Sequence, residues 1–332
     1  MIILVTIGMV IAASILSWGG TAVVRRWLLA RQILDQPNAR SSHHIPVPRG
    51  GGVAVVLAVT AMLIPIMIPP SGVVVKELAI ILGATLIVAG ISFWDDLRGL
   101  PAWVRFLSHI AAVVAGVFTF PDSGIFQGWL PGQLDRAIAA LLWVWFINLY
   151  NFMDGIDGLA ALETIAISLG LVIVSVFAGT GVDLWPVIIA GAAMGFLIWN
   201  FPPAKIFLGD VGSVALGYML GYLLLMLASR GAWAAAVILP MYYLVDATIT
   251  LFQRCIRGEK IWHAHREHAY QKAVIHGSSH GAVIGQITLC NIFLVILAGL
   301  TMIASPRVDL VLVGFAFGLS AILWRHLSRQ RR

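Results

Sequence analysis

Long apolar segments separated by short polar ones occupy almost the whole chain. A helix that crosses a bilayer needs about 20 mostly apolar residues, and dividing the chain at its polar clusters predicts eleven such helices. The predicted spans are 2–24, 51–69, 77–93, 104–120, 136–150, 159–178, 185–200, 211–228, 232–252, 282–304 and 308–324. Because backbone groups inside lipid must satisfy one another, the pattern predicts an all-α polytopic integral membrane protein.

The composition supports this class. Of the 332 residues, 60% are hydrophobic and only 11% are charged, whereas soluble domains carry roughly 25% charged residues. The chain contains no internal repeat and no low-complexity tract, so residues 1–332 are interpreted as one integral membrane domain. The net charge of +6 is explained by the loops of a membrane protein, and no nucleic-acid partner is expected.

The basic residues predict the orientation. The first apolar segment has no basic residue before it and is followed by Arg25 and Arg26, so it is interpreted as a membrane helix and not as a cleaved signal peptide. With the N-terminus outside, seventeen of the 21 Lys and Arg residues fall on the inner side. The four outer ones are Lys76, Arg136, Arg230 and Arg307. The positive-inside rule therefore predicts a periplasmic N-terminus and a cytoplasmic C-terminus.

Polar segments and acidic residues gather on the predicted inner face. The five inner segments are 40–52, 93–105, 148–160, 200–213 and 254–272. The acidic residues at inner helix ends are Asp95, Asp96, Asp154, Asp157 and Asp210. Acids near membrane spans are costly and often functional, although helix capping or solvated loop charge would explain any single one. Their convergence on one face predicts an active site at the cytoplasmic surface, built from loops on a helical scaffold.

The segment NLYNFMDGIDGLA (148–160) places a polar residue at every third position. The four residues are Asn148, Asn151, Asp154 and Asp157. Residues three apart share roughly one helix face, so we expect a polar stripe that begins inside the fifth span and leaves it. The glycines at 155 and 158 are expected to let a ligand approach the backbone. The next span begins there, and its N-terminal N–H groups favour an anion at the same place.

Two other acidic corners and several bases complete the candidate site. Asp210, between two glycines in FLGDVGS (207–213), suits either a helix N-cap or an oxygen ligand for Mg²⁺. The adjacent Asp95 and Asp96 are expected to repel one another or share a metal. The basic residues in the inner loops are Arg49, Arg105, Lys205 and Arg266. Acids and bases around a metal ion suit phosphoryl transfer.

The segment HAHREHAYQ (263–271) contains three histidines, His263, His265 and His268. Zinc is the competing interpretation, but no further Cys or His follows at a zinc-finger spacing. Contact with phosphate or sugar is therefore preferred. Asp246 lies within the ninth span and is interpreted as a buried structural partner for a neighbouring helix or base.

Taken together, these segments resemble the polyprenyl-phosphate N-acetylhexosamine-1-phosphate transferase family, of the glycosyltransferase family 4 type. The matching motifs are the Asp pair at 95–96, NLYNFMDGIDGLA, FLGDVGS, HAHREHAYQ and HIPVPRGGG (44–52). The resemblance implies that a polyprenyl phosphate attacks the β-phosphate of a UDP-sugar, so that UMP leaves and a polyprenyl-diphosphate sugar forms. It implies an enzyme of the bacterial inner membrane that acts on a UDP-N-acetyl-sugar and undecaprenyl phosphate. Mg²⁺, or Mn²⁺ in its place, is the implied cofactor, and homodimer formation is left open.

The resemblance also implies roles for individual residues. The implied catalytic residues are Asp95, Asp96, Asp154, Asp157 and Asp210, with Asp210, Asp154 and Asp95 as the metal residues. The implied substrate-binding residues are Arg49, Arg105, Asn148, Asn151, Lys205, Phe207, His263, His265, Arg266 and His268. Phe207 matches an aromatic position that stacks on uracil, and Asp95 matches a group often proposed to deprotonate the lipid phosphate. A phosphomonoester has a second pKa of about 6, so a base gains little at pH 7, and Asp95 is interpreted as orienting the acceptor or the metal.

One departure from the usual family motif indicates a particular branch of the family. The paired-Asp motif reads DDLRG, with Gly99 where the family often has Asp or Asn. This form, together with EHAYQ, resembles the branch that starts O-antigen or capsule chains, whose members are associated with UDP-FucNAc or UDP-QuiNAc. UDP-GlcNAc is the third candidate donor. Two other classes are weighed. A secondary transporter would place its charges near the midplane of repeated halves, and a CDP-alcohol phosphotransferase would carry one dense Asp motif.

Overall fold

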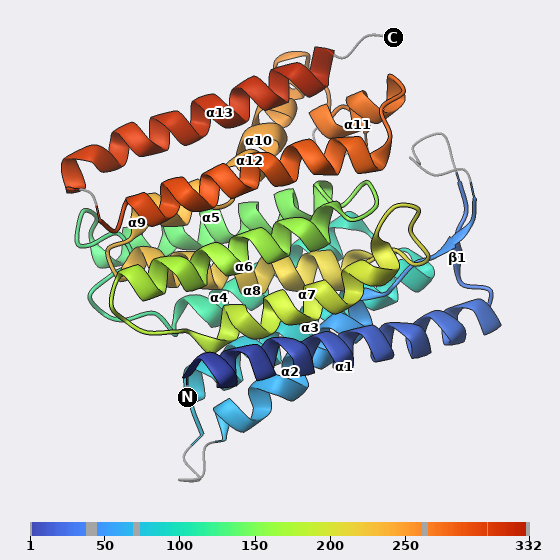
Figure 1. The fold of residues 1–332 in the computed structure, drawn as a ribbon, viewed down its shortest axis with the longest axis horizontal. Helices are drawn as coiled ribbons and strands as arrows, with labels where there is room; N and C mark the ends of the chain where they lie inside the picture. The colour runs from blue at the N-terminus through green and yellow to red at the C-terminus, as the bar shows by residue number, and fades with distance from the viewer. Residues whose placement is uncertain (1, 38–44, 69–73, 261–264, 304, 330–332) are drawn as a thin grey trace.

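The computed structural model describes residues 2–37, 45–68, 74–260, 265–303 and 305–329, which fold into a bundle of roughly parallel and antiparallel helices (Figure 1). The first eight helices are α1 (Ile2–Ala30), α2 (Gly52–Met67), α3 (Lys76–Arg98), α4 (Ala102–Val117), α5 (Gly132–Phe152), α6 (Leu159–Phe177), α7 (Leu184–Asn200) and α8 (Asp210–Ser229). The others are α9 (Trp233–Ile238), α10 (Met241–Ile256), α11 (Ala269–Ile275), α12 (His280–Leu300), the 3₁₀ turn η1 (Pro306–Val308) and α13 (Asp309–Arg329). The all-α expectation holds, apart from two short strands, β1 (Leu34–Asp35) and β2 (Val47–Pro48).

Each predicted span corresponds to helix, with one correction. The ninth span, expected as one helix over 232–252, is two helices, because the chain turns at Pro240 between α9 and α10. Proline has no N–H to donate and its ring clashes with the preceding turn, so it ends a helix. Within the described residues, six helices are long and apolar enough to cross a membrane, namely α1, α3, α6, α8, α12 and α13. Helices α2, α4 and α7 are apolar but shorter.

Helix α8 lies at the centre of the bundle. In the most apolar 18-residue stretch of α8, 89% of the residues are buried. In the corresponding stretch of α1, at the edge of the bundle, 11% are buried (Figure 1). Glycines bring α5 close to α8, since a Cβ at Gly221 would lie 2.6 Å from Trp143. The Trp143 ring stacks on Tyr218 at 4.7 Å, and its indole N–H donates to the Tyr218 carbonyl at 2.9 Å. Close packing of this kind fixes the direction of α8, whose first residue is Asp210.

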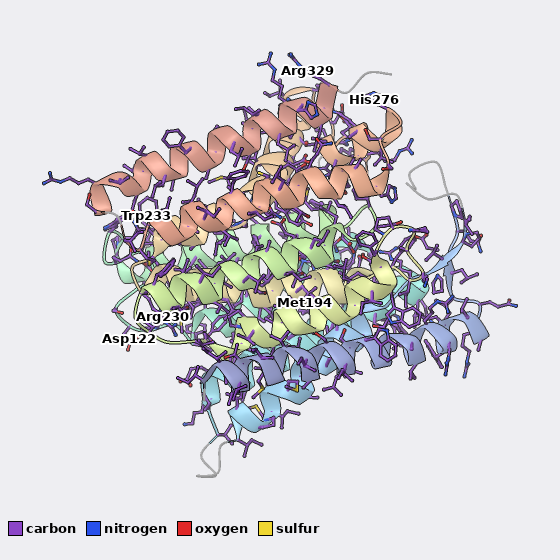
Figure 2. The ribbon with its side chains drawn as sticks, in the orientation of Figure 1. Asp122, Met194, Arg230, Trp233, His276 and Arg329 are labelled. Atoms are coloured by element: carbon purple, nitrogen blue, oxygen red, sulfur yellow. The ribbon has the colours of Figure 1, made fainter. Side chains whose placement is uncertain are left out.

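The two ends of the bundle differ. Figure 2 places Asp122, Arg230 and Trp233 at one end and His276 at the other. The β1–β2 hairpin and the connections α3–α4, α5–α6, α7–α8 and α11–α12 lie at the His276 end (Figure 1). Helix α1 begins at the opposite end, and α13 finishes at the His276 end (Figure 1).

Candidate active site

Three segments meet at the His276 end, where the residues after β2 pack on the beginning of α8. The carbonyl of Phe207 accepts from the backbone N–H groups of Gly50 (3.1 Å) and Gly51 (2.9 Å), and the carbonyl of Leu208 accepts from Gly52 (2.8 Å). A Cβ at Gly52 would lie 2.3 Å from the Cα of Gly212 on α8. The run of glycines is therefore required for close approach of two backbones. It places Arg49 directly over the first turn of α8.

Asp96, from the last turn of α3, caps α8 from outside that helix. Its two carboxylate oxygens accept from the backbone N–H groups of Asp210 and Val211, each at 3.1 Å. The same carboxylate lies 3.0 Å from Nε of Arg49, and its side chain is 1% exposed. A helix N-terminus leaves N–H groups without partners and carries partial positive charge, so a carboxylate stabilises it. The observed contacts of Asp96 thus fix the start of α8 and hold Arg49 beside it.

The next glycine shows how tightly this junction is packed. Gly209 precedes α8 with φ +76°, a conformation that residues with a Cβ rarely adopt. A Cβ there would lie 2.7 Å from the Asp96 carboxylate and 3.1 Å from the backbone nitrogen of Gly50. Position 209 therefore accepts only glycine without a shift of the surrounding chain.

Asp210 lies between two guanidinium groups. Arg49 pairs with one of its carboxylate oxygens, and Nη1 of Arg105 lies 3.2 Å from the other. The same Nη1 atom lies 2.9 Å from Asp95, whose second oxygen accepts from the Leu100 N–H. Burial disfavours the charged form of Arg49, but the carboxylates of Asp210 and Asp96 outweigh it and raise the pKa of Arg49. Three of the predicted acids and two of the predicted bases therefore form one charged cluster.

The predicted polar stripe is helical only in its first half. Helix α5 ends at Phe152, so Asn148 and Asn151 lie on it, whereas Asp154 and Asp157 lie in the turn that follows. At Gly155 the space in the direction of a Cβ is filled by protein, and approach of a ligand to its backbone stays a prediction. A Cβ at Gly155 would lie 2.2 Å from the Tyr270 hydroxyl, which donates to the Phe152 carbonyl at 2.9 Å.

Asp154 and Asp157 extend the charged cluster in different ways. Burial raises the pKa of Asp154, Arg49 lowers it, and the carboxylates of Asp210, Asp96 and Asp157 raise it again. These influences show that Asp154 shares the electrostatic field of the cluster. In the part of the chain that the structure describes, its carboxylate accepts no hydrogen bond. Asp157, by contrast, accepts from the Ala204 N–H at 3.0 Å.

The predicted histidine segment is only partly described, since His263 lies outside the described residues. Asp246 on α10 caps α11 by accepting from the N–H groups of Ala269 (2.9 Å) and Tyr270 (3.4 Å), which confirms its interpretation as a buried structural partner. His268 is 1% exposed and lies 3.4 Å from Asp246. Burial, and then the neighbouring His268, lower the pKa of His265 to about 4. His265 is therefore neutral at pH 7.

Three further predicted residues lie in the inner loops. The Lys205 ammonium lies 5.8 Å from the centre of the Trp199 ring, and the Lys205 carbonyl accepts from Arg25 at 3.1 Å. The backbone of Phe207 pairs with the backbone of Arg49 in an isolated parallel β-bridge. Arg266 lies between His265 and Glu267 in the connection before α11. These contacts link the loops to one another, and the roles of these three residues toward a substrate stay predictions.

Three residues near the cluster were not predicted from the sequence. His109 on α4 is 4% exposed, and its Nδ1 atom has no hydrogen-bond partner among the described residues. Asn200 accepts from the Gly158 N–H at 2.9 Å, which holds the turn that carries Asp157. His280, at the start of α12, lies 3.2 Å from the Asp157 carboxylate. Histidine and asparagine at helix ends are common, so no local spacing in the sequence indicates these contacts.

The charges of the cluster fit a divalent cation. The carboxylates of Asp95, Asp96 and Asp210 contact the two guanidinium groups of Arg49 and Arg105. Asp154 interacts electrostatically with Arg49 and with Asp157, which brings the number of carboxylates to five. Carboxylate oxygens are the ligands that Mg²⁺ prefers, usually one or two of them together with substrate phosphates. The described residues contain no group of three His, Cys, Asp or Glu already arranged around a common point. The donors therefore suit an ion that is completed by a phosphate-bearing ligand.

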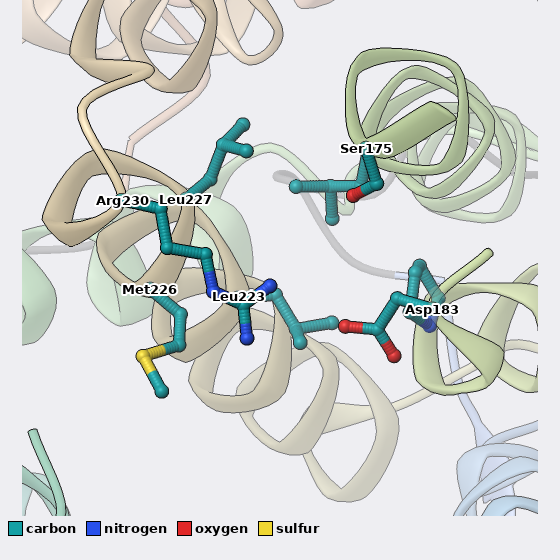
Figure 3. Close-up of a pocket in the computed structure, with 8 residues that line it drawn as sticks. Ser175, Asp183, Leu223, Met226, Leu227 and Arg230 are labelled. Carbon is teal, nitrogen blue, oxygen red and sulfur yellow. The ribbon is translucent and has the colours of Figure 1, made fainter. Parts of the chain in front are cut away.

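A separate pocket lies at the other end of the bundle. Figure 3 shows Ser175 of α6, Asp183 before α7, and Leu223, Met226, Leu227 and Arg230 at the end of α8 around it. Helix α8 has 20 residues, so its two ends are about 30 Å apart at 1.5 Å per residue. The pocket is therefore remote from Asp210 and is not part of the charged cluster.

Comparison with known proteins gives related sequences. The sequence model of the family described as Glycosyl transferase family 4 matches residues 78–228, which include all five predicted acids. The probable undecaprenyl-phosphate N-acetylglucosaminyl 1-phosphate transferase of Bacillus subtilis (strain 168) is 30% identical over 282 residues, covering 78% of this chain and 75% of the relative. The decaprenyl-phosphate N-acetylglucosaminephosphotransferase of Mycobacterium tuberculosis (strain ATCC 25618 / H37Rv) is 29% identical over 310 residues, covering 82% and 77%. The phospho-N-acetylmuramoyl-pentapeptide-transferase of Limosilactobacillus fermentum is 33% identical over 182 residues, covering 50% and 56%.

Proposed function

This chain belongs to glycosyl transferase family 4 and is a multi-pass polyprenyl-phosphate N-acetylhexosamine-1-phosphate transferase of the bacterial cytoplasmic membrane, and we propose that its acceptor is undecaprenyl phosphate. In the proposed reaction, a phosphate oxygen of the acceptor attacks the β-phosphorus of a UDP-N-acetyl-sugar. The bond between that phosphorus and the bridging oxygen of UMP breaks. The products are undecaprenyl-diphosphate sugar and UMP.

The meeting of Asp210 with Arg49 and Arg105 is the observation that carries this proposal. Phosphoryl transfer needs positioning and neutralisation of negative charge more than covalent chemistry. The two guanidinium groups supply fixed positive charge at one point, where they are held by Asp95, Asp96 and Asp210. Two diphosphate oxygens in place of two carboxylate oxygens would make comparable charge-assisted hydrogen bonds. The same arginines can therefore hold the UDP-sugar.

Mg²⁺ is the proposed cofactor, held by Asp210, Asp154 and Asp95 together with the substrate phosphates. When bound, the ion supplies electrostatic stabilisation of the transferred phosphate. Asp96 is already engaged by two backbone N–H groups and Arg49, so it serves to orient Asp210. Asp154, whose carboxylate accepts no hydrogen bond from the described residues, is open to a ligand.

The sugar and the pathway form the finer part of the proposal. The sequences DDLRG (95–99) and EHAYQ (267–271) support UDP-FucNAc or UDP-QuiNAc as the donor, in the first step of O-antigen or a related surface polysaccharide. The N-acetylglucosamine phosphotransferases among the relatives support UDP-GlcNAc. A secondary transporter is disfavoured, because the charged groups lie at one end of the bundle and not near its middle. Measuring UMP release with each of the three UDP-sugars in turn shows which one is the donor.

The proposed orientation places the charged cluster in the cytoplasm, the N-terminus in the periplasm and the C-terminus in the cytoplasm. The distribution of Lys and Arg supports it. Single cysteines introduced as His276→Cys and Asp122→Cys, with both native cysteines replaced, test it in intact cells. A membrane-impermeant thiol reagent should label only the variant at 122. Labelling of the variant at 276 instead would reverse the orientation.

The activity is tested with purified protein in lipid nanodiscs, undecaprenyl phosphate, Mg²⁺ and a panel of UDP-sugars. Release of UMP with one of the N-acetylated donors is expected, together with a lipid product that carries the sugar. Asp210→Asn is the negative control, and Asp122→Ala, at the other end of the bundle, is the positive one (Figure 2). If no donor releases UMP from the wild type, the proposal fails.

A further inference from the structure

The first residue of α12 contacts the turn that carries Asp157, although 123 residues separate them. Nδ1 of His280 lies 3.2 Å from Oδ2 of Asp157 and 3.4 Å from its backbone nitrogen. The two side chains are 14% and 11% exposed, so water competes only partly for this contact. The pairing joins the helix that follows the histidine segment to one of the five acids of the cluster.

The protonation of the ring follows from these distances. The backbone N–H of Asp157 is placed to donate to Nδ1 of His280 at 3.4 Å, which needs a ring nitrogen without a hydrogen. The contact between Nδ1 and Oδ2 at 3.2 Å needs the opposite, a hydrogen on Nδ1, because a carboxylate oxygen only accepts hydrogen bonds. The two contacts exclude one another, and the contact with the charged oxygen is the shorter. We assign the hydrogen to Nδ1 on this ground. The His280 N–H and the Ala204 N–H (3.0 Å) then donate to the same oxygen of Asp157. No donor among the described residues reaches Oδ1, which is left for a ligand.

The surrounding turn is held from both sides. Asn200, at the end of α7, accepts from the Gly158 N–H at 2.9 Å and donates to the Ile206 carbonyl at 3.0 Å. Gly158 has φ +77°, and a Cβ there would lie 3.2 Å from Ile284, one turn after His280 on α12. The α7–α8 loop and the beginning of α12 therefore enclose the turn, and His280 is the contact from α12 that reaches the carboxylate.

We propose that His280 is a positioning residue for the UDP-sugar: with the Ala204 N–H it holds Oδ2 of Asp157, so that Oδ1 faces the nucleotide–metal end of the site. The inference rests on the proposed function, because it assigns Asp157 to UDP-sugar binding. A carboxylate that is held by two donors is already oriented when the ligand arrives. It loses less rotational freedom on binding than an unrestrained one. The effect is therefore expected on the affinity for the nucleotide, and not on the affinity for the lipid.

Three substitutions separate this role from general packing. His280→Ala removes the donor. His280→Asn places an amide at about the distance of Nδ1 from the backbone, whereas His280→Gln places it at about the distance of Nε2, and both amides can donate. Only the asparagine is expected to restore the contact with Asp157. His276→Ala is the matched control, because His276 is exposed, lies four residues earlier and has no described contact with an acid (Figure 2).

The measurements are KM for the UDP-sugar, KM for undecaprenyl phosphate, kcat, and the affinity for UDP with Mg²⁺ by calorimetry. For His280→Ala and His280→Gln we expect the KM for the UDP-sugar and the Kd for UDP to rise about tenfold, the scale of one hydrogen bond to a charged group that is partly exposed. The KM for the lipid should stay within about twofold of wild type. His280→Asn should recover most of the loss. In an Asp157→Asn background, His280→Ala should add less than about twofold, since the two residues act through one contact.

The outcomes distinguish the inference from the proposed function. If the wild type binds UDP but transfers no sugar phosphate, the proposed function fails, and the affinity measurements still test His280. If the wild type is active and His280→Ala resembles His276→Ala, the inference is wrong. Equal values for the asparagine and glutamine variants would also overturn it. This comparison remains decisive if the alanine variant does not fold.

Discussion

Replacing Asp96 by alanine removes the carboxylate that caps α8. In the structure, this carboxylate accepts from the backbone N–H groups of Asp210 and Val211 and pairs with Arg49 at 3.0 Å. Loss of an N-cap costs about 1 kcal/mol. The Arg49 pair adds no more than about 1 kcal/mol, because the arginine side chain is 38% exposed and the interaction is screened. We therefore expect a loss of about 2 kcal/mol in the free energy of unfolding.

The consequence for activity is expected to be larger than the consequence for stability. Without the cap, the first turn of α8 can shift, and Asp210 shifts with it. A displacement of 1 Å at a reacting centre can cost about a hundredfold in rate. The expected result for Asp96→Ala is thus a protein that folds, with kcat reduced about a hundredfold. Asp96→Asn keeps one accepting oxygen and should lie between alanine and wild type in both properties.

Thermal unfolding in nanodiscs and UMP release measure the two effects. At about 2–4 °C per kcal/mol for a chain of 150–250 residues, the midpoint should fall by about 4 °C, or somewhat less in this longer chain. Asp122→Ala is the matched control. It removes an exposed ion pair with Arg136 (2.8 Å), which contributes little to stability, so its midpoint should be unchanged. If Asp96→Ala unfolds at the wild-type temperature, the capping argument is refuted.

Four other predictions follow from the same site. Asp210→Asn should abolish Mg²⁺-dependent UMP release while the unfolding midpoint stays within a few degrees, and retained Mg²⁺-dependent turnover would move the metal elsewhere. Arg105→Lys should lower kcat/KM about tenfold, because one ammonium cannot reproduce a guanidinium that contacts both Asp95 and Asp210; activity equal to wild type would contradict this. Asp95→Asn should lose the same fraction of activity at pH 6 and pH 8.5, because a residue that orients the acceptor or the metal takes up no proton from the phosphate, whose second pKa is about 6. A much smaller loss at pH 8.5, where the phosphate is already dianionic, would restore the role of Asp95 as a base. Gly209→Ala should destabilise the protein by about 1–3 kcal/mol in thermal unfolding, because alanine is strained at a φ of +76°. Gly83→Ala, at a position in open space on α3, should cause no such loss. Equal unfolding midpoints for the two variants would contradict the strain at position 209.

The sequence alone determined the class of protein and most of its helices. A membrane span must satisfy its backbone hydrogen bonds within one segment, so the information for it is local and can be recognised from a run of apolar residues. The acids were also recognisable, because carboxylates at the ends of apolar segments are unusual. The break at Pro240 was missed because α9 and α10 together present one continuous apolar segment.

Only the tertiary structure decided what each polar residue contacts. Arg49 meets Asp210 across 161 positions of the chain, and His280 meets Asp157 across 123. Two adjacent acids of the same type differ in their contacts: Asp96 caps α8, and Asp95 pairs with Arg105. Such contacts depend on the direction and depth at which helices pack, which close approaches of glycine backbones set here. The spacing of residues along one segment does not predict this packing geometry, because residues far away in the chain determine it.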